Sequence, residues 1–148
     1  MTTNLKPKWL TVHCSATPPE MDIGRDEIRQ WHLKRGWNDI GYHYVIRRNG
    51  DIELGRELHV QGAHVVGHNQ DNLGICLVGG CDSQMQAQDN FTLAQRKALF
   101  ALISQLQQKY TIDDQHVTAH SQWNSAKACP VIKINNGDSL AHYIAEKE

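Results

Sequence analysis

Trp9-Leu-Thr-Val-His-Cys14, close to the start of the chain, is typical of a β-strand. Successive side chains of a strand point to opposite faces of the sheet. Leu10 and Val12 would therefore face one side, and His13 would face the other side near the end of the strand. The segment 16–19, which ends in two prolines, then breaks the strand. A histidine is thus presented where the chain leaves the sheet.

The rest of the chain mixes strand-like and helix-like segments without strict alternation. We expect strands at residues 42–48, 51–54, 73–78 and 116–119, and helices at 25–35 and 92–110, with a last helix capped by Asp138. Asn49-Gly50 between two strand-like runs is a strong hairpin signal. Thr92 and Gln95 form a capping box at the start of the longest helix. These elements predict a mixed α/β fold, in which helices flank a central, mostly β-sheet.

Size and charge narrow the classes of protein. The chain has 148 residues, which is the length of one domain with a substantial core. Its formal net charge is -1 and it has no basic tract, so nothing indicates a site for nucleic acid or for an anionic membrane. The polar residues 1–8 do not resemble a secretory signal, and no segment approaches the length of a transmembrane helix. We therefore expect one domain over residues 1–148, with its core at about 9–145, and a cytoplasmic location.

The histidines and cysteines suggest a metal site. The chain has 9 histidines and 4 cysteines, and thiols in a leaderless chain are more often free or metal-bound than paired. His13 ends the first strand, His120 opens a polar loop, and Cys129 closes that loop. Zinc prefers imidazole and thiolate, and a catalytic zinc has three protein ligands and one open position. Spacing alone leaves the ordinary alternative open, in which the histidines are surface residues and the cysteine is a small core residue.

Two more residues fit a hydrolase built on that metal. Lys127 lies two residues before Cys129, so in an extended segment the two side chains share a face. Its ammonium could stabilise the oxyanion that develops when an amide is attacked, although a solvated lysine is the ordinary alternative. Tyr42 follows Gly41 at the start of a strand. Its phenol could orient the attacking water, although a strand aromatic that faces the interior is the ordinary alternative.

Other catalytic mechanisms find less support. The chain has no G-x-S-x-G elbow, no P-loop and no G-x-G-x-x-G motif. Two of the three residues Asp22, Asp26 and Glu27 could be considered as a carboxylate pair for glycoside cleavage. They lie at the start of a predicted helix, where acidic residues interact favourably with the helix dipole, and this accounts for them.

Several segments together resemble one known family. They are Trp9-Leu-Thr-Val-His-Cys-Ser-Ala-Thr17, Ile28-Arg-Gln-Trp-His32, Gly36-Trp37, Gly41-Tyr-His-Tyr44, Gly62-Ala-His64, Leu73-Gly-Ile-Cys-Leu-Val-Gly-Gly80 and Ala126-Lys-Ala-Cys-Pro130. The family is that of the type-2 N-acetylmuramoyl-L-alanine amidases, which share their fold with animal peptidoglycan recognition proteins. The likeness is strongest to the small lysozymes, or endolysins, of short-tailed T-odd phages. It extends from about Trp9 to Pro130, which is nearly the whole chain.

The resemblance implies a role for each candidate residue. One Zn²⁺ per chain would be held by the residues that match the family's ligands, which are His13, His120 and Cys129. Tyr42 and Lys127 match its catalytic residues, and His64 and Asn69 match parts of its substrate groove. His43 ranks lower, because alternation turns it away from Tyr42. The remaining histidines keep ordinary structural or surface roles: His32, His59, His68, His116 and His142.

The activity implied is hydrolysis of the amide bond between N-acetylmuramic acid and L-alanine in bacterial peptidoglycan, as in a phage or prophage endolysin. We expect a monomer without a separate wall-binding domain, which stays in the host cytoplasm until the membrane is permeabilised. One alternative is a module that binds peptidoglycan without cutting it, but non-catalytic members of the family usually lack the cysteine ligand, and this chain has Cys129. Another is an amidase that also binds and inhibits a phage RNA polymerase.

Two departures from the family's pattern qualify these implications. The usual segment after the ligand cysteine is replaced by Pro130-Val-Ile-Lys133, which puts the groove contacts there in doubt. The segment before His13 is shorter than in the phage lysozymes, and the N-terminus is the part implicated in polymerase binding. The polymerase role therefore transfers less readily than the hydrolase role.

Overall fold

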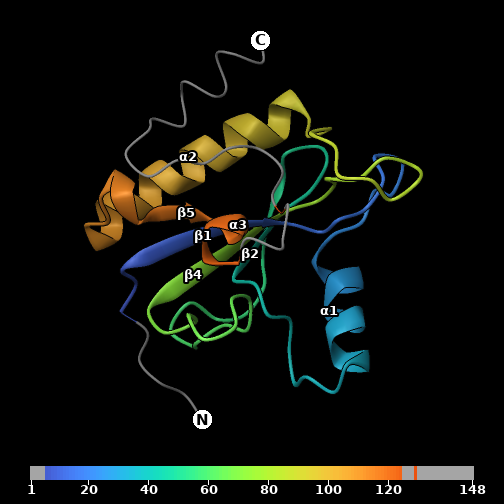
Figure 1. The fold of residues 1–148 in the computed structure, drawn as a ribbon. Helices are drawn as coiled ribbons and strands as arrows, with labels where there is room; N and C mark the ends of the chain where they lie inside the picture. Colours follow the sequence, from blue (N-terminus) through green and yellow to red (C-terminus); the bar gives the residue numbers. More distant parts are fainter. Residues whose placement is uncertain (1–5, 125–128, 130–148) are drawn as a thin grey trace.

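The computed structural model describes residues 6–124 and 129, and it contains a mixed α/β fold around a five-stranded sheet (Figure 1). The strands are β1 (Trp9–Cys14), β2 (Tyr44–Ile46), β3 (Ile52–Leu54), β4 (Asn72–Leu77) and β5 (Val117–Ala119). The helices are α1 (Arg25–Lys34), α2 (Leu93–Tyr110), the 3-10 turn η1 (Asp114–His116) and α3 (His120–Trp123). No helix in the described part of the chain is both long and apolar enough to cross a membrane. The predicted fold class is confirmed.

The sheet has the order β3-β2-β4-β1-β5. β1 pairs in parallel with both β4 and β5, and β2 pairs in parallel with β4. β2 and β3 are antiparallel, and the turn between them contains Asn49 and Gly50, which confirms the predicted hairpin. Gly50 has a φ of +93°, a left-handed conformation that glycine adopts without steric cost. The only antiparallel pair between named strands is therefore the local hairpin at the edge of the sheet.

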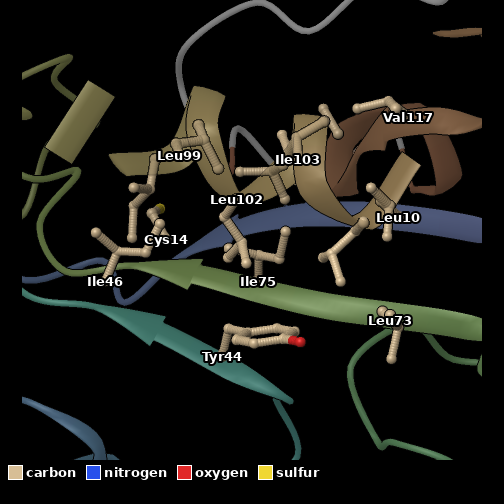
Figure 2. Close-up of a cluster of buried hydrophobic side chains, with 14 of the residues drawn as sticks. Leu10, Cys14, Tyr44, Ile46, Leu73, Ile75, Leu99, Leu102, Ile103 and Val117 are labelled. Carbon is tan, nitrogen blue, oxygen red and sulfur yellow. The ribbon is translucent and has the colours of Figure 1, made fainter. Parts of the chain in front are cut away.

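One face of the sheet packs against α2 and forms the larger hydrophobic core (Figure 2). Leu10 and Val12 of β1 point into it, as the alternation of the first strand predicts. Leu99, Leu102 and Ile103 cover them from α2. Full burial of one such aliphatic side chain stabilises a fold by ~1.5–3 kcal/mol, so this face supplies much of the stability.

The opposite face carries a smaller cluster in which Ile28 of α1 packs with Ile40, Val45, Cys76 and Val78. Residues of β4 alternate between the two clusters, so α1 and α2 cover opposite faces of the sheet, as in Figure 1. This second face also carries the polar side chains of β1. The candidate site lies on this less completely covered side.

Several element boundaries differ from those expected. Only residues 44–46 of the predicted strand 42–48 pair as β2. The first helix ends at Lys34 and buries His32, whose Nδ1 accepts the backbone N–H of Gly41 at 2.9 Å. The predicted loop after His120 begins with the single helical turn α3. The predicted helix at Asp138 lies outside the described residues.

Gln95 joins α2 to the sheet. Its side-chain N–H groups donate to the carbonyls of Ile46, at 3.2 Å, and of Val78, at 2.8 Å. Its Oε1 accepts the backbone N–H of Thr92 at 3.0 Å, which completes the predicted capping box. The Gln95 side chain is fully buried, and its two hydrogen bonds to the sheet carbonyls are shielded from water.

Replacing Gln95 with leucine tests this network. The carbonyls of Ile46 and Val78 would each lose one of two donors, because Ile46 also accepts the N–H of Val78 and Val78 also accepts from Arg48. The N–H of Thr92 would lose the Gln95 acceptor as well, and each lost hydrogen bond costs ~0.5–1.5 kcal/mol. We expect Gln95→Leu to lower the free energy of unfolding by about 2–3 kcal/mol in urea titrations. Gln108→Leu, at an exposed position of the same helix, should change it by less than ~0.5 kcal/mol. Equal effects of the two substitutions would contradict the role of Gln95.

Candidate metal centre

His13 and His120 lie at the same edge of the sheet because their strands run parallel. Val12 of β1 is in register with Ala119 of β5, and His13 and His120 are the residues that directly follow these two in the chain. His120 is also the first residue of α3. Parallel pairing thus brings together two side chains that are 107 residues apart in sequence.

Cys129 is attached to the same edge through backbone contacts. The N–H of Cys14 donates to its Sγ at 2.7 Å, and the carbonyl of Cys129 accepts the N–H of Ser121 at 3.0 Å. The Cys14 side chain and burial raise the pKa of the Cys129 thiol, so a metal ion would bind the sulfur by displacing its proton. The sulfur therefore lies beside the residue that follows His13.

The three predicted ligands come together. Ligand atoms of His13, His120 and Cys129 all lie within 4.8 Å of one another, and the two Nδ1 atoms are 3.1 Å apart. Two nitrogens that share one tetrahedral zinc, each ~2.0–2.1 Å from it, would be ~3.3 Å apart. Among residues 6–124 and 129, this is the group whose side chains could hold a metal ion. Two imidazoles and a thiolate suit zinc by their chemistry as well as their spacing.

The three side chains differ in their exposure. His13 is 1% exposed, whereas His120 and Cys129 are partly exposed. His13 therefore holds the cluster in the interior, and His120 and Cys129 extend it to the surface. Burial, followed by the neighbouring His64 and His120, holds the pKa of His13 well below its usual range. His13 is therefore neutral at physiological pH, as a metal ligand must be.

Tyr42 lies next to this cluster. Its ring centroid is 5.1 Å from that of His13 and 5.5 Å from that of His32. Burial raises the pKa of its phenol well above the ordinary value of 10. The phenol is thus a neutral O–H group beside the candidate ligands, able to donate or accept a hydrogen bond. Lys127, the other predicted catalytic residue, lies outside the described residues.

The two residues assigned to the substrate groove have partners within the protein. His64 is buried, and its Nδ1 lies 2.9 Å from Nε2 of His13. Asn69 Oδ1 accepts the N–H groups of His64, at 2.8 Å, and of Val65, at 2.9 Å. Asn69 thus holds the loop that carries His64. Contact of either residue with substrate stays a prediction.

The sequence reasoning missed a supporting network beneath α3. Oγ1 of Thr11 lies 3.0 Å from Oγ1 of Thr118, and Nε1 of Trp123 donates to both oxygens, at 3.1 and 2.9 Å. The indole of Trp123 therefore anchors the turn that begins with His120. Thr11 lies two residues before His13 in β1 and therefore shares its face, and this alternation is the sequence signal that could have indicated the network.

A family model for N-acetylmuramoyl-L-alanine amidase matches residues 3–131. The chain belongs to this family. Membership confirms the resemblance drawn from the motifs, and the matched region contains all three candidate ligands of this amidase.

Phage endolysins are similar to this amidase over most of its length. The endolysin of Klebsiella phage KP32 is 48% identical over 119 residues, which are 80% of this chain and 77% of the endolysin. The endolysin of Escherichia phage T7 is 44% identical over 119 residues, with the same shares of the two chains. Among solved structures, the N-acetylmuramoyl-L-alanine amidase LysC from Clostridium intestinale has a TM-score of 0.75 at 28% identity, and the match covers 97% of this chain and 86% of LysC.

Buried neutral histidines make the stability of the amidase depend on pH. Burial lowers the pKa of His32 and of His43 to about 4, from an ordinary 6.5. The unfolded chain therefore binds more protons, so this stability is fully present above pH ~6.5 and is lost as the pH falls toward ~4. We expect the free energy of unfolding of metal-free protein to fall between pH 7 and pH 5, by about 1 kcal/mol per pH unit for each histidine.

Urea titrations at several pH values measure this effect. His32→Asn keeps an acceptor for the N–H of Gly41 but cannot be protonated, so the slope with pH should decrease. The exposed His59→Asn is the matched control and should leave the slope unchanged. A free energy of unfolding that stays constant from pH 7 to pH 5 would contradict burial in the neutral form.

Proposed function

We propose that this N-acetylmuramoyl-L-alanine amidase works as an endolysin that uses one zinc ion to hydrolyse the amide bond between N-acetylmuramic acid and L-alanine. The observation that carries the proposal is the convergence of His13, His120 and Cys129 at one sheet edge. Family membership and the phage endolysins among its relatives support the substrate and the biological role.

The ligand set fits zinc in a catalytic rather than a structural role. Structural zinc sites use four protein ligands, whereas catalytic sites use three and leave a position open. The described residues offer three, and two of those reach the surface. When bound there, zinc would lower the pKa of a water ligand toward ~7 and polarise the carbonyl of the scissile amide.

Tyr42 would act on the attacking water. Its phenol is neutral and lies beside His13, so it can orient the water by a hydrogen bond or pass on its proton. Water adds to the lactyl carbonyl carbon of N-acetylmuramic acid, and the C–N bond then breaks. The departing amine of L-alanine takes up a proton, and the lactyl group becomes a carboxylate. Tyr42 thus serves proton transfer and orientation, not covalent catalysis.

Lys127 would stabilise the negative charge that develops on the carbonyl oxygen. The resemblance assigns it this role, and its position two residues before Cys129 would bring an ammonium close to the ligand set. Such a contact strengthens in the transition state and therefore lowers the barrier to reaction. His64 and Asn69 stay candidates for the substrate groove.

A purely binding function is disfavoured by the residues that are present. Recognition of peptidoglycan requires neither a clustered ligand set nor a phenol beside it, and the chain has both. Binding of a phage RNA polymerase rests on the resemblance alone, and residues 1–5, which belong to the implicated terminus, lie outside the described part of the chain. We also propose that the enzyme is a monomer and stays in the host cytoplasm until lysis.

Metal content gives the first test. Purified protein should contain about one zinc per chain, as three ligands with an open position would hold. Cys129→Ala should lose the metal and the activity, because it removes the thiolate. Cys81→Ala removes a buried thiol outside the ligand group and is the matched control, which should keep both. Full zinc content and full activity in Cys129→Ala would show that the ligand assignment is wrong.

The identity of the broken bond gives the second test. Mass spectrometry of digested peptidoglycan should find free stem peptides that begin with an L-alanine amine, and glycan strands of unchanged length. New reducing sugar ends without free alanine amines would indicate a glycosidase. Tight binding to peptidoglycan with no released peptide at full zinc content would support the binding module instead.

A further inference from the structure

His64 connects the candidate ligand His13 to the backbone of β4. Its Nε2 lies 2.7 Å from the carbonyl oxygen of Asn72, and its Nδ1 lies 2.9 Å from Nε2 of His13. The other nitrogen of His13, Nδ1, faces Nδ1 of His120 at 3.1 Å. The carbonyl of Asn72, the ring of His64 and the ring of His13 thus form one chain of hydrogen bonds that leads to the candidate ligands.

The chemistry of these atoms fixes the direction of each hydrogen bond. A carbonyl oxygen can only accept, so Nε2 of His64 carries a hydrogen and donates to Asn72. A buried imidazole is neutral, so Nδ1 of His64 has a lone pair and accepts from Nε2–H of His13. The lone pair of His13 is then on Nδ1, which is the atom that faces His120.

The structure holds the ring of His64 in place by sterics as well. A Cβ atom on Gly74 would lie 2.7 Å from Cγ of His64, and one on Gly62 would lie 2.8 Å from its Cδ2. These two glycines therefore leave the space that the imidazole fills. The Asn69 side chain fixes the backbone of His64 by accepting its N–H. A ring confined in this way cannot turn to offer other atoms to His13.

We propose that His64 is a positioning residue, which holds His13 in the tautomer that directs the Nδ1 lone pair at the metal site. The proposal rests on the proposed zinc function, because it assigns His13 as a ligand. It differs from the predicted groove role of His64, which would act on substrate and leave the metal unaffected. Loss of such a supporting hydrogen bond costs ~10–100-fold in metal affinity.

Two substitutions at position 64 separate hydrogen bonding from packing. The amide of His64→Gln carries both an acceptor for His13 and a donor for Asn72, whereas His64→Leu carries neither. Zinc affinity is measured by competition with a chromogenic chelator. We expect His64→Leu to bind zinc ~10–100-fold more weakly and His64→Gln to recover most of that loss. The exposed His59→Leu, in the same loop, is the matched control and should bind zinc as the wild type does.

The tautomer is observed directly in the zinc-free wild-type protein. Long-range ¹H–¹⁵N spectra of ¹⁵N-histidine-labelled protein should show His13 protonated at Nε2 and unprotonated at Nδ1. This measurement needs no variant and no metal, so it decides the proposal even where His64→Leu fails to fold. It also separates the two hypotheses, since a wild-type protein that binds no zinc would overturn the proposed function while the spectrum still reports the tautomer.

Three results would overturn the role of His64. The first is a wild-type spectrum with the hydrogen of His13 on Nδ1. The second is equal weakening of zinc binding in His64→Gln and His64→Leu, which would indicate packing alone. The third is a raised KM in His64→Leu while its zinc affinity stays within about threefold of the wild-type value. That result would indicate that His64 contacts the substrate.

Discussion

β1 lies between two parallel partners, and this pairing governs where every candidate ligand lies. Parallel strands that pair in register end at the same edge of a sheet. His13, which follows Val12, and His120, which follows Ala119, are therefore brought together by strand pairing. Pairing with β4 on the other side brings in Asn72, whose carbonyl holds His64. A shift of one residue between β1 and β5 would turn one histidine to the opposite face and separate the ligands. The register of the sheet is thus a condition for chemistry as well as for stability.

The two faces of β1 have separate tasks. Leu10 and Val12 bury apolar surface against α2, and this burial stabilises the sheet. Thr11 and His13 face the other way, where Thr118 and Trp123 satisfy the threonine hydroxyl and support α3. The site is therefore built on a strand whose position is fixed by the packing of its opposite face against α2. Side chains on such a strand are held more precisely than side chains on a loop.

Much of this arrangement was predictable from local pattern, and the rest depends on long-range contacts. Alternation in β1 and the capping box at Thr92 each follow from neighbouring residues, and both were confirmed. The turn α3 is too short to show helical periodicity, and it is held by the Gln122 side chain, which accepts the N–H of Ala119. The contact of His64 with His13 spans 51 residues, and no local signal encodes it. The candidate ligands were predicted from the motifs through resemblance, and spacing alone did not single them out.

The sequence separation of the ligands has a thermodynamic consequence. The sulfur of Cys129 accepts the backbone N–H of Cys14, a residue 115 positions earlier. The candidate ligands therefore converge only when the chain is folded. An unfolded chain would offer them at random distances and bind zinc weakly, so zinc would bind almost only to the native state. At a free zinc concentration 100 times the dissociation constant, this linkage adds ~2.7 kcal/mol to the free energy of unfolding. The supply of zinc in its surroundings would therefore set the resistance of the enzyme to heat and to proteases, in addition to its activity.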